Sequence, residues 1–322
     1  MLNTKQMKAK KKALEYFGGN PVGNSFAAGS SAASGGLFPG NVVGVGVGAR
    51  SPDGAGPAGE ILVRVYVTTK TSKLKIPDCF DDFPTEVLEV GDVVATALLS
   101  TGQRFGRHRP ASCGVSVGHP NVTAGTLGCR VEKNGKHYIL SNNHVLANCN
   151  LAKFSDAIVQ PGTLDGGKSP TDNIATLEKY MKIKFSGPAN DYDAAIADLI
   201  KSSDLESDII DIGPPGKTPP AVALYQSVRK HGRTTGHTVG VVVDLSVSLW
   251  VGYGVRRAWF QDQVAIQGVG ASHFSAGGDS GSLIVDAVTL DPVALLFAGS
   301  TSGLTFGNPI APVLSRYGVV IA

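Results

Sequence analysis

A serine flanked by glycines is the residue in this chain best suited to nucleophilic chemistry. Ser280 lies in residues 275–282, which read Ser-Ala-Gly-Gly-Asp-Ser-Gly-Ser. Glycine adopts positive φ angles at little cost, so the backbone beside the serine can turn sharply and approach a bound group closely. Such a loop can point successive N–H groups at one spot, which a developing oxyanion requires. Ordinary Gly/Ser turns between strands have similar compositions, so the rest of the chain must supply a base.

A histidine and an aspartate further upstream are candidates for the base and the group that orients it. A serine hydroxyl becomes a good nucleophile only when an oriented base accepts its proton. His144 follows an apolar, strand-like run, and Asp193 precedes another run of small apolar residues. Asp191 and Asp198 compete for the orienting role. We favour Asp193 because the apolar run begins directly after it.

The three stretches together resemble the chymotrypsin/trypsin-like serine proteases. Residues 278–281 match the Gly-Asp-Ser-Gly loop of that family letter for letter, and residues 193–197 match its aspartate strand. Residues 140–145 match its histidine corner more loosely, with Asn-Asn where Ala-Ala is usual. The resemblance covers about residues 111–322 and the motifs occur in the family's order, His, Asp, Ser.

The resemblance implies a role for each matched residue. Ser280 would attack the scissile carbonyl, and His144 would take the proton and return it to the leaving amine. Asp193 would hold the imidazole and stabilise its protonated form. The backbone N–H groups of Gly278 and Ser280 would form the oxyanion hole.

The resemblance also implies a pocket for the substrate's first side chain. In the family, the strand that corresponds to residues 293–300 lines this pocket and pairs with the substrate backbone, which brings in Ser300. Gly303 is expected to open the pocket. Phe274, six residues before the nucleophile, occupies the position that often forms the pocket base in the family, and its apolar ring argues against trypsin-like selectivity for Arg or Lys. His273 beside it predicts selection of acidic side chains instead.

Composition and turn signals predict a mainly β protein. The chain has 322 residues with 41 glycines, 42% hydrophobic and 17% charged residues, which is typical of a globular chain of many short strands. The resemblance implies two six-stranded antiparallel β-barrels, which we expect to be preceded by a small α/β module. The predicted division is a basic tail and flexible linker (1–40), an accessory module (41–110), a first barrel (111–215) and a second barrel (216–322).

Several shorter patterns predict individual elements. Alternating or continuous apolar runs predict strands at 42–48, 60–68, 86–90, 173–178, 239–250, 256–267 and 293–300. The strand at 60–68 is expected to bury one face. Asn134-Gly135 predicts the two-residue turn of a β-hairpin that leads to His144. A proline-rich run at 213–220 predicts the connection between the barrels.

The first residues predict a short basic helix and a cytoplasmic protein. The lysines at the start are Lys5, Lys8, Lys10, Lys11 and Lys12. We expect this segment to be a solvated tail, the alternative being contact with an anionic membrane or a partner. No export-type apolar stretch follows the basic residues, and no run is long enough to form a transmembrane helix. A cytoplasmic location keeps cysteines reduced, so Cys129 and Cys149, which flank His144, are expected to be buried thiols.

The remaining features exclude some classes of function. A formal charge of +3 is too small to indicate nucleic-acid binding. His231 and His237 are separated by few residues but lack a nearby carboxylate or cysteine, so no metal is expected, and no motif indicates a cofactor. The expected partner is a protein or peptide substrate, with docking of another protein on the N-terminal module as a further option.

The sequence therefore favours a serine endopeptidase that acts through His144, Asp193, Ser280 and an acyl-enzyme. Two alternatives stay open: a latent or inactive trypsin-like fold used for binding or scaffolding, and an esterase with the same triad. No basic cleavage site followed by an activation terminus precedes the first barrel, although Asp279, which such a terminus pairs with in secreted relatives, is present. Activation is expected to work by loop ordering or by release of the N-terminal module.

Overall fold

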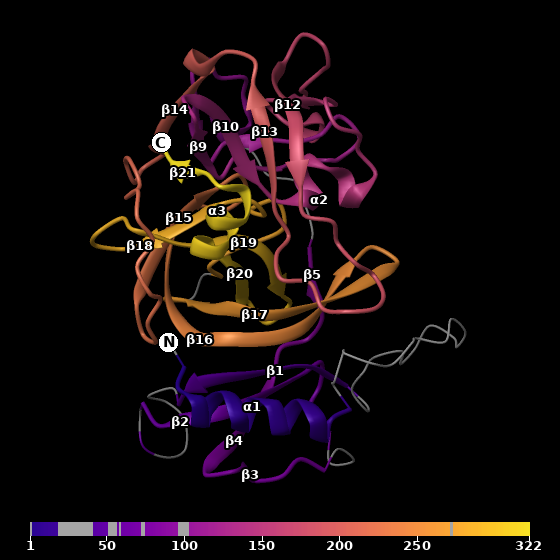
Figure 1. Ribbon diagram of the computed structural model, residues 1–322, viewed down its shortest axis with the longest axis vertical. Coiled ribbons are helices and arrows are strands. Elements are labelled where there is room, and N and C mark those ends of the chain that lie inside the picture. The colour runs from indigo at the N-terminus through magenta and orange to yellow at the C-terminus, as the bar shows by residue number, and fades with distance from the viewer. Residues whose placement is uncertain are drawn as a thin grey trace.

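The computed structural model describes residues 2–18, 41–50, 57, 59–71, 75–95, 103–270 and 273–322. Most of the predicted linker (18–40) lies outside these residues. The described chain is mainly β, as predicted, and its helices are α1 (Thr4–Tyr16), α2 (Asn143–Leu146) and α3 (Ile310–Tyr317). Three layers follow one another along the long axis of the molecule: the N-terminal elements, the strands of the C-terminal half, and the strands that carry α2 (Figure 1).

The layer that carries α2 is a six-stranded sheet. Its order is β11 (Ala157–Val159), β12 (Asn173–Tyr180), β13 (Ala195–Leu199), β10 (Lys136–Ser141), β9 (Cys129–Lys133) and β21 (Val320–Ile321). Asn134 and Gly135 take φ angles of 52° and 76° between β9 and β10, which confirms the predicted hairpin turn. Two short pairs complete this half: β7 (Ser116–Val117) with β8 (Gly125–Thr126), and β6 (Ala111–Cys113) with β14 (Leu205–Ile209).

The C-terminal half forms a closed ring of strand pairs. The order is β15 (Ser227–Gly232), β18 (Leu283–Asp286), β19 (Pro292–Ser300), β20 (Thr305–Pro309), β17 (Arg256–Gly268) and β16 (Gly236–Tyr253), and β16 pairs back with β15. A single core joins the two halves, since Leu283 and Leu295 pack in the same buried cluster as Leu140. The pairing path of the first half runs from β11 to β21 without closing, so a pair of six-stranded barrels stays a prediction.

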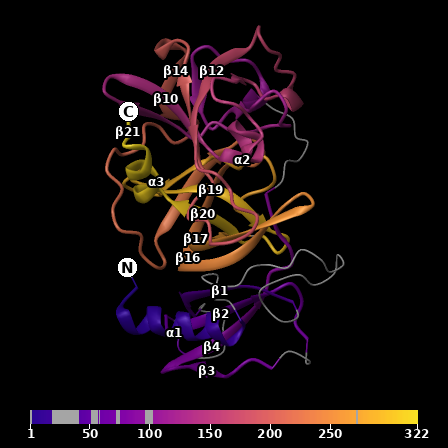
Figure 2. The same ribbon diagram turned by 45° about the vertical axis from the view of Figure 1, so that its right-hand side comes forward.

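The N-terminal strands extend the sheet of the C-terminal half. β1 (Val42–Ala49) pairs antiparallel with β16, β2 (Ile61–Val67) pairs with β1, and β4 (Phe83–Glu89) pairs with β2 and β3 (Cys79–Phe80). The prediction that residues 60–68 bury one face is wrong. β2 is buried on both faces because α1 covers one side and β16 approaches the other, where Arg64 donates hydrogen bonds to Glu86 and to the Val243 carbonyl oxygen (Figure 2).

The prediction that the basic N-terminal segment is a solvated tail is also wrong. It forms α1, whose Ala9 and Ala13 are buried with Phe17 in a cluster that includes Trp259 of β17. The Lys10 ammonium is buried and donates hydrogen bonds to Ser246 (2.7 Å) and Asp262 (2.8 Å). Desolvation lowers the pKa of Lys10, and the charge of Asp262 opposes that shift. The N-terminal elements are therefore packed against the C-terminal half, which makes release of a separate module a poor mechanism of activation.

Replacing Lys10 tests this packing. We expect Lys10→Ala to lower the free energy of unfolding by about 1–3 kcal/mol, because a charge-assisted hydrogen bond is lost while half-exposed Asp262 remains hydrated. Urea unfolding followed by circular dichroism measures the change. Lys8→Ala, at an exposed position of the same helix, is the control and should leave the curve unchanged. Equal stability of the two variants would contradict the observed docking of α1.

Candidate active site

The histidine and the aspartate predicted from the sequence form a close pair. His144 lies in α2, directly after β10, and Asp193 lies just before β13, which pairs with β10. The His144 ring Nδ1 lies 2.6 Å from the Asp193 Oδ2, and the His144 backbone N–H donates to Oδ1 at 3.2 Å. The carboxylate can therefore fix which imidazole nitrogen carries the proton, leaving Nε2 free to act as a base.

Asp193 is fully buried and is held from several sides. The Tyr253 hydroxyl donates a hydrogen bond to Oδ2 at 2.8 Å. Asn308 accepts from the Asp193 N–H, and the Asn142 amide donates to the Asp193 carbonyl oxygen. Burial raises the pKa of Tyr253 well above its usual value, and the charge of Asp193 adds to that shift, so this hydroxyl stays a donor. A buried carboxylate needs such donors to offset its lost hydration.

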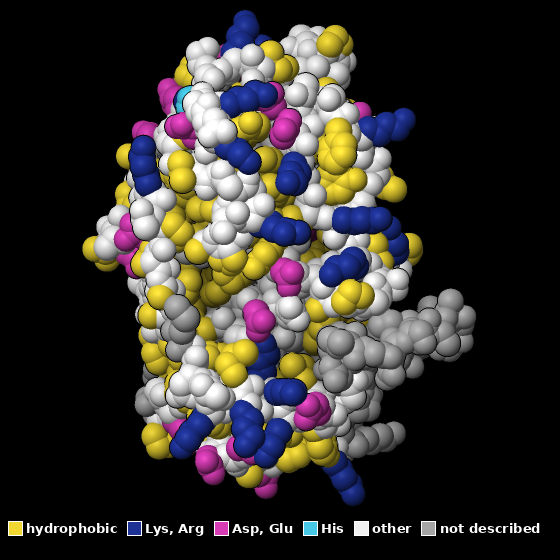
Figure 3. Space-filling view, in the orientation of Figure 1, with side chains coloured by type: hydrophobic (Ala, Val, Ile, Leu, Met, Phe, Trp, Pro, Cys, Tyr) yellow, Lys and Arg dark blue, Asp and Glu magenta, His cyan; other side chains and the backbone are white. Residues whose placement is uncertain are grey.

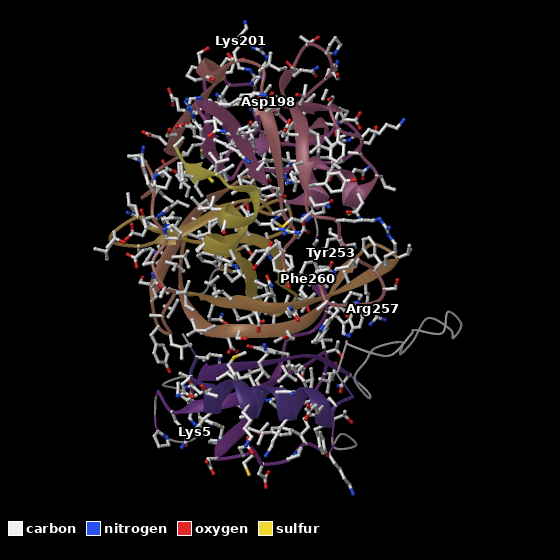
Figure 4. The ribbon with its side chains drawn as sticks, viewed as in Figure 1. Lys5, Asp198, Lys201, Tyr253, Arg257 and Phe260 are labelled. Carbon is white, nitrogen blue, oxygen red and sulfur yellow. The ribbon has the colours of Figure 1, made fainter. Side chains whose placement is uncertain are left out.

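The two competing aspartates lie elsewhere. Asp191 accepts a hydrogen bond from Gln261, and Asp198 forms an ion pair with Lys136 at 2.6 Å. Figure 4 places Asp198 in the layer of β9–β13, far from Tyr253, whose hydroxyl contacts Asp193. Asp193 is thus the carboxylate that reaches His144, as the sequence predicted.

Ser280 faces the same cavity as His144. This cavity has a volume of about 210 Å³, and its lining includes Tyr253 and Cys149. We name it the histidine cavity. The Ser280 hydroxyl donates a long hydrogen bond, 3.5 Å, to the Phe297 carbonyl oxygen of β19. The hydroxyl is thus directed at β19, and among the described residues it makes no hydrogen bond with the His144 ring.

The loop around Ser280 takes the glycine-dependent shape that its sequence predicts. Gly278 and Gly281 have φ angles of 98° and 97°, and a Cβ on Gly278 would lie 2.4 Å from the Thr234 Oγ1. Among the described residues, the backbone N–H groups of Gly278 and Ser280 have no acceptor. Two buried, unpaired N–H groups next to a serine are what an oxyanion site requires, so the predicted oxyanion hole remains a consistent assignment.

Asp279 is paired with a cation from within the chain. Its carboxylate lies 3.4 Å from the Lys230 ammonium, and both side chains are fully buried. The carboxylate also accepts hydrogen bonds from the N–H groups of Thr234, Thr235 and Ala276. Burial lowers the pKa of Lys230, and Asp279 opposes that shift. Lys230 thus supplies a positive charge to Asp279 from within the chain.

The predicted pocket residues are only partly brought together. A cavity of about 230 Å³ lies between the nucleophile loop and β19, and we name it the side-chain cavity. Its lining includes Ser280, Ser300 and the exposed His273. Phe274 does not form its base: His273 and Ser275 on either side of it line the cavity, whereas the Phe274 ring is fully buried in the cluster beneath Gly240. Gly303 packs against the His273 ring, where a Cβ would lie 2.7 Å from Nδ1.

The cysteines and the remaining histidines do not add to the site chemistry. All four cysteines are free thiols, and burial raises the pKa of Cys149 to about 11 and that of Cys129 well above its usual value. His231 and His237 face each other across β15 and β16. Within the described residues no group of three or more His, Cys, Asp or Glu side chains could hold a metal ion.

Comparisons with known proteins find similarity in fold alone. No protein-family model matches the sequence, and no curated protein does either. Solved structures with similar folds include a glutamic acid specific serine protease (18% identity, TM-score 0.48, 66% of this chain and 100% of that one). Thermobifida fusca protease A is similar at 17% identity and a TM-score of 0.47, over 66% of this chain and 99% of that one. The chain is structurally similar to chymotrypsin-like serine proteases at low sequence identity.

Three residues of the site escaped the sequence reading. Tyr253 and Asn308 reach Asp193 from strands far along the chain, and no local motif marks them. Lys230 gave no signal in the sequence. Its partner Asp279 is 49 residues away (279 minus 230), so only the fold identifies the pair.

The buried ion pair between Lys230 and Asp279 leads to a prediction about the stability of the protein. We expect Lys230→Met to lower the free energy of unfolding by about 3–5 kcal/mol, because Asp279 would remain buried without its cation. Urea unfolding measures this, and Lys201→Met at an exposed position is the control. A Lys230→Met protein as stable as the control would show that Asp279 does not depend on this ammonium.

Proposed function

We propose that this protein is a serine endopeptidase that cleaves peptide bonds through Ser280, His144 and Asp193 by way of an acyl-enzyme. The observation that carries the proposal is the 2.6 Å contact between His144 and a fully buried Asp193, with Ser280 facing the same cavity. Ser280 attacks the carbonyl carbon while His144 accepts its proton. The proton then passes to the leaving amine, and water completes the cycle by the same route.

The surroundings of the three residues support peptide chemistry. The unpaired N–H groups of Gly278 and Ser280 are available to a developing oxyanion. The side-chain cavity lies beside the nucleophile, and β19 runs along it with backbone groups that can pair with an extended peptide. A simple ester needs no such strand, which favours the peptidase over the esterase.

We also propose that the two β halves correspond to the two barrels of the trypsin-like fold and that the protein is cytoplasmic. The ring from β15 to β16 supports the first assignment for the C-terminal half. Four free cysteines fit a reducing compartment. In the described part of the chain no helix is both long and apolar enough to cross a membrane. On the face seen in Figure 3, acidic and basic side chains are interspersed, which gives no continuous basic surface for nucleic acid.

Labelling with a fluorophosphonate tests the proposal. We expect covalent modification at Ser280 in the wild type, located by mass spectrometry, and its loss in both Ser280→Ala and His144→Ala, because the nucleophile needs its base. His137→Ala is a matched control, since the His137 ring lies 3.2 Å from the Ser202 hydroxyl on the surface and faces no cavity of the proposed site. Labelling that persists in His144→Ala would contradict the assigned roles.

Removing the charge of the orienting group gives a separate prediction. Asp193→Asn should reduce the rate of peptide cleavage about 10⁴-fold, because the amide favours the wrong imidazole tautomer without changing the shape of the site. Rates measured with an internally quenched peptide give this value. Asp198→Asn, where the wild-type carboxylate pairs with Lys136, is the control and should retain full activity. An active Asp193→Asn protein would mean that another group orients His144.

A further inference from the structure

The edge of β19 beside the nucleophile is already occupied by the chain itself. A short strand, β5 (Val93–Val94), pairs antiparallel with this edge, with Val94 opposite Gly299 and Val93 opposite Ser300. The Thr301 N–H donates a hydrogen bond to the Asp92 carbonyl oxygen at 3.1 Å. Antiparallel addition to an exposed strand edge is the mode by which extended peptides bind.

The end of the β16–β17 hairpin lies on the other side of β5. Val94 pairs with Gly252 of β16, and the Ala95 N–H donates to the Gly252 carbonyl oxygen at 3.1 Å. Figure 1 shows β5 in the middle of the molecule, between this hairpin and α2. Val93 is only 5% exposed. The segment is therefore enclosed between two strands and is part of the folded cleft.

The path of this segment passes the nucleophile. Val94 lines the side-chain cavity and Ala95 lines the histidine cavity, and Ser280 borders both. The bond between Val94 and Ala95 thus connects the side where the substrate's first side chain would bind to the side where His144 lies. Because β5 is antiparallel to β19, the chain passes from Val93, opposite Ser300, to Val94, opposite Gly299, and then to Ala95 beside the histidine cavity.

We propose that residues 93–95 take the place of the peptide substrate in the resting protein. The substrate is then an extended peptide with small aliphatic side chains in the same register, with Val-Val before the cleaved bond and Ala after it. The inference rests on the proposed peptidase activity. Substrate binds only when β5 leaves the edge of β19. The apparent affinity for substrate is therefore the intrinsic affinity multiplied by the fraction of molecules in which this edge is free.

Gly91 is the position that lets the segment lie this close. It has a φ angle of 66°, and a Cβ placed on it would lie 1.9 Å from the Thr301 Oγ1. A β-branched residue rarely adopts such a φ angle and would also collide with Thr301, the residue directly after β19. Gly91→Val should therefore move the segment away from the strand edge without changing the triad.

The experiment compares Gly91→Val with Gly59→Val, using cleavage of an internally quenched peptide that contains Gly-Asp-Val-Val-Ala, the sequence of residues 91–95. Gly59 is a matched control because it also has a positive φ angle, 79°, but a Cβ there would meet nothing within 4 Å. We expect Gly91→Val to lower KM at least tenfold with kcat unchanged, since an internal competitor affects only binding. The control should match the wild type.

Two results would overturn the inference while leaving the peptidase assignment intact. One is a folded Gly91→Val protein, by circular dichroism, whose KM is unchanged or higher. The other is faster cleavage of a matched peptide with glutamate in place of the second valine, which would assign the side-chain cavity to acidic residues through His273. Absence of fluorophosphonate labelling at Ser280 in both the wild type and Gly91→Val would instead overturn the proposed function, and this inference with it.

A second measurement needs no variant, in case Gly91→Val does not fold. The wild type is treated with a diphenyl phosphonate carrying Asp-Val-Val or with a plain fluorophosphonate, and hydrogen exchange is followed at residues 90–95. We expect the peptidyl reagent to remove protection of these amides because it displaces β5, whereas the plain reagent leaves them protected. Modification of Ser280 by the peptidyl reagent with protection unchanged would overturn the inference.

Discussion

The buried carboxylate of Asp193 is the point at which the two halves of the molecule are joined chemically. The carboxylate contacts His144 of the first half and accepts a hydrogen bond from the Tyr253 hydroxyl of the second. The Asp193 backbone N–H donates to the side-chain oxygen of Asn308, also of the second half. A charge with no exposed surface is tolerated only when such partners replace water. Because Tyr253 and Asn308 come from the second half, the full set of hydrogen bonds to Asp193 forms only when both halves are packed together. Packing of the two halves against each other therefore also completes the surroundings of Asp193.

The strand β16 extends the same dependence to the N-terminal elements. One edge of this long strand pairs with β17 and part of the other with β1, while its far end carries Tyr253 and pairs with β5. A disturbance of the N-terminal strands can therefore reach the triad through a single element. The described strands β1, β2 and β4 thus continue the sheet of the C-terminal half, although the sequence separates them clearly from the matched motifs.

The parts of the site that the sequence predicted are those determined by short stretches of chain. The turn at Asn134-Gly135 depends on φ angles that these two residues tolerate, and the loop at Ser280 depends on its glycines. Asp193 could be chosen over Asp191 and Asp198 because the position of a residue relative to a buried strand is a local property. In each case the conformation is determined by a few neighbouring residues, so a short sequence pattern is enough to predict it.

The parts that escaped the sequence depend on pairings between distant segments. Nothing in residues 90–95 differs from an ordinary short strand, and the segment acquires its meaning only because its partner is the edge of β19 next to Ser280. Lys10 and Lys230 likewise look like ordinary surface lysines until the fold surrounds them. Phe274 and His273 both stayed open in the sequence for the same reason: which of two neighbouring side chains reaches the cavity depends on how the loop packs, and His273 is the one that lines it. The pairing of β5 with β19 and the buried Lys230–Asp279 pair are therefore properties of the assembled fold, whereas the glycine-dependent loop around Ser280 is already visible in the sequence.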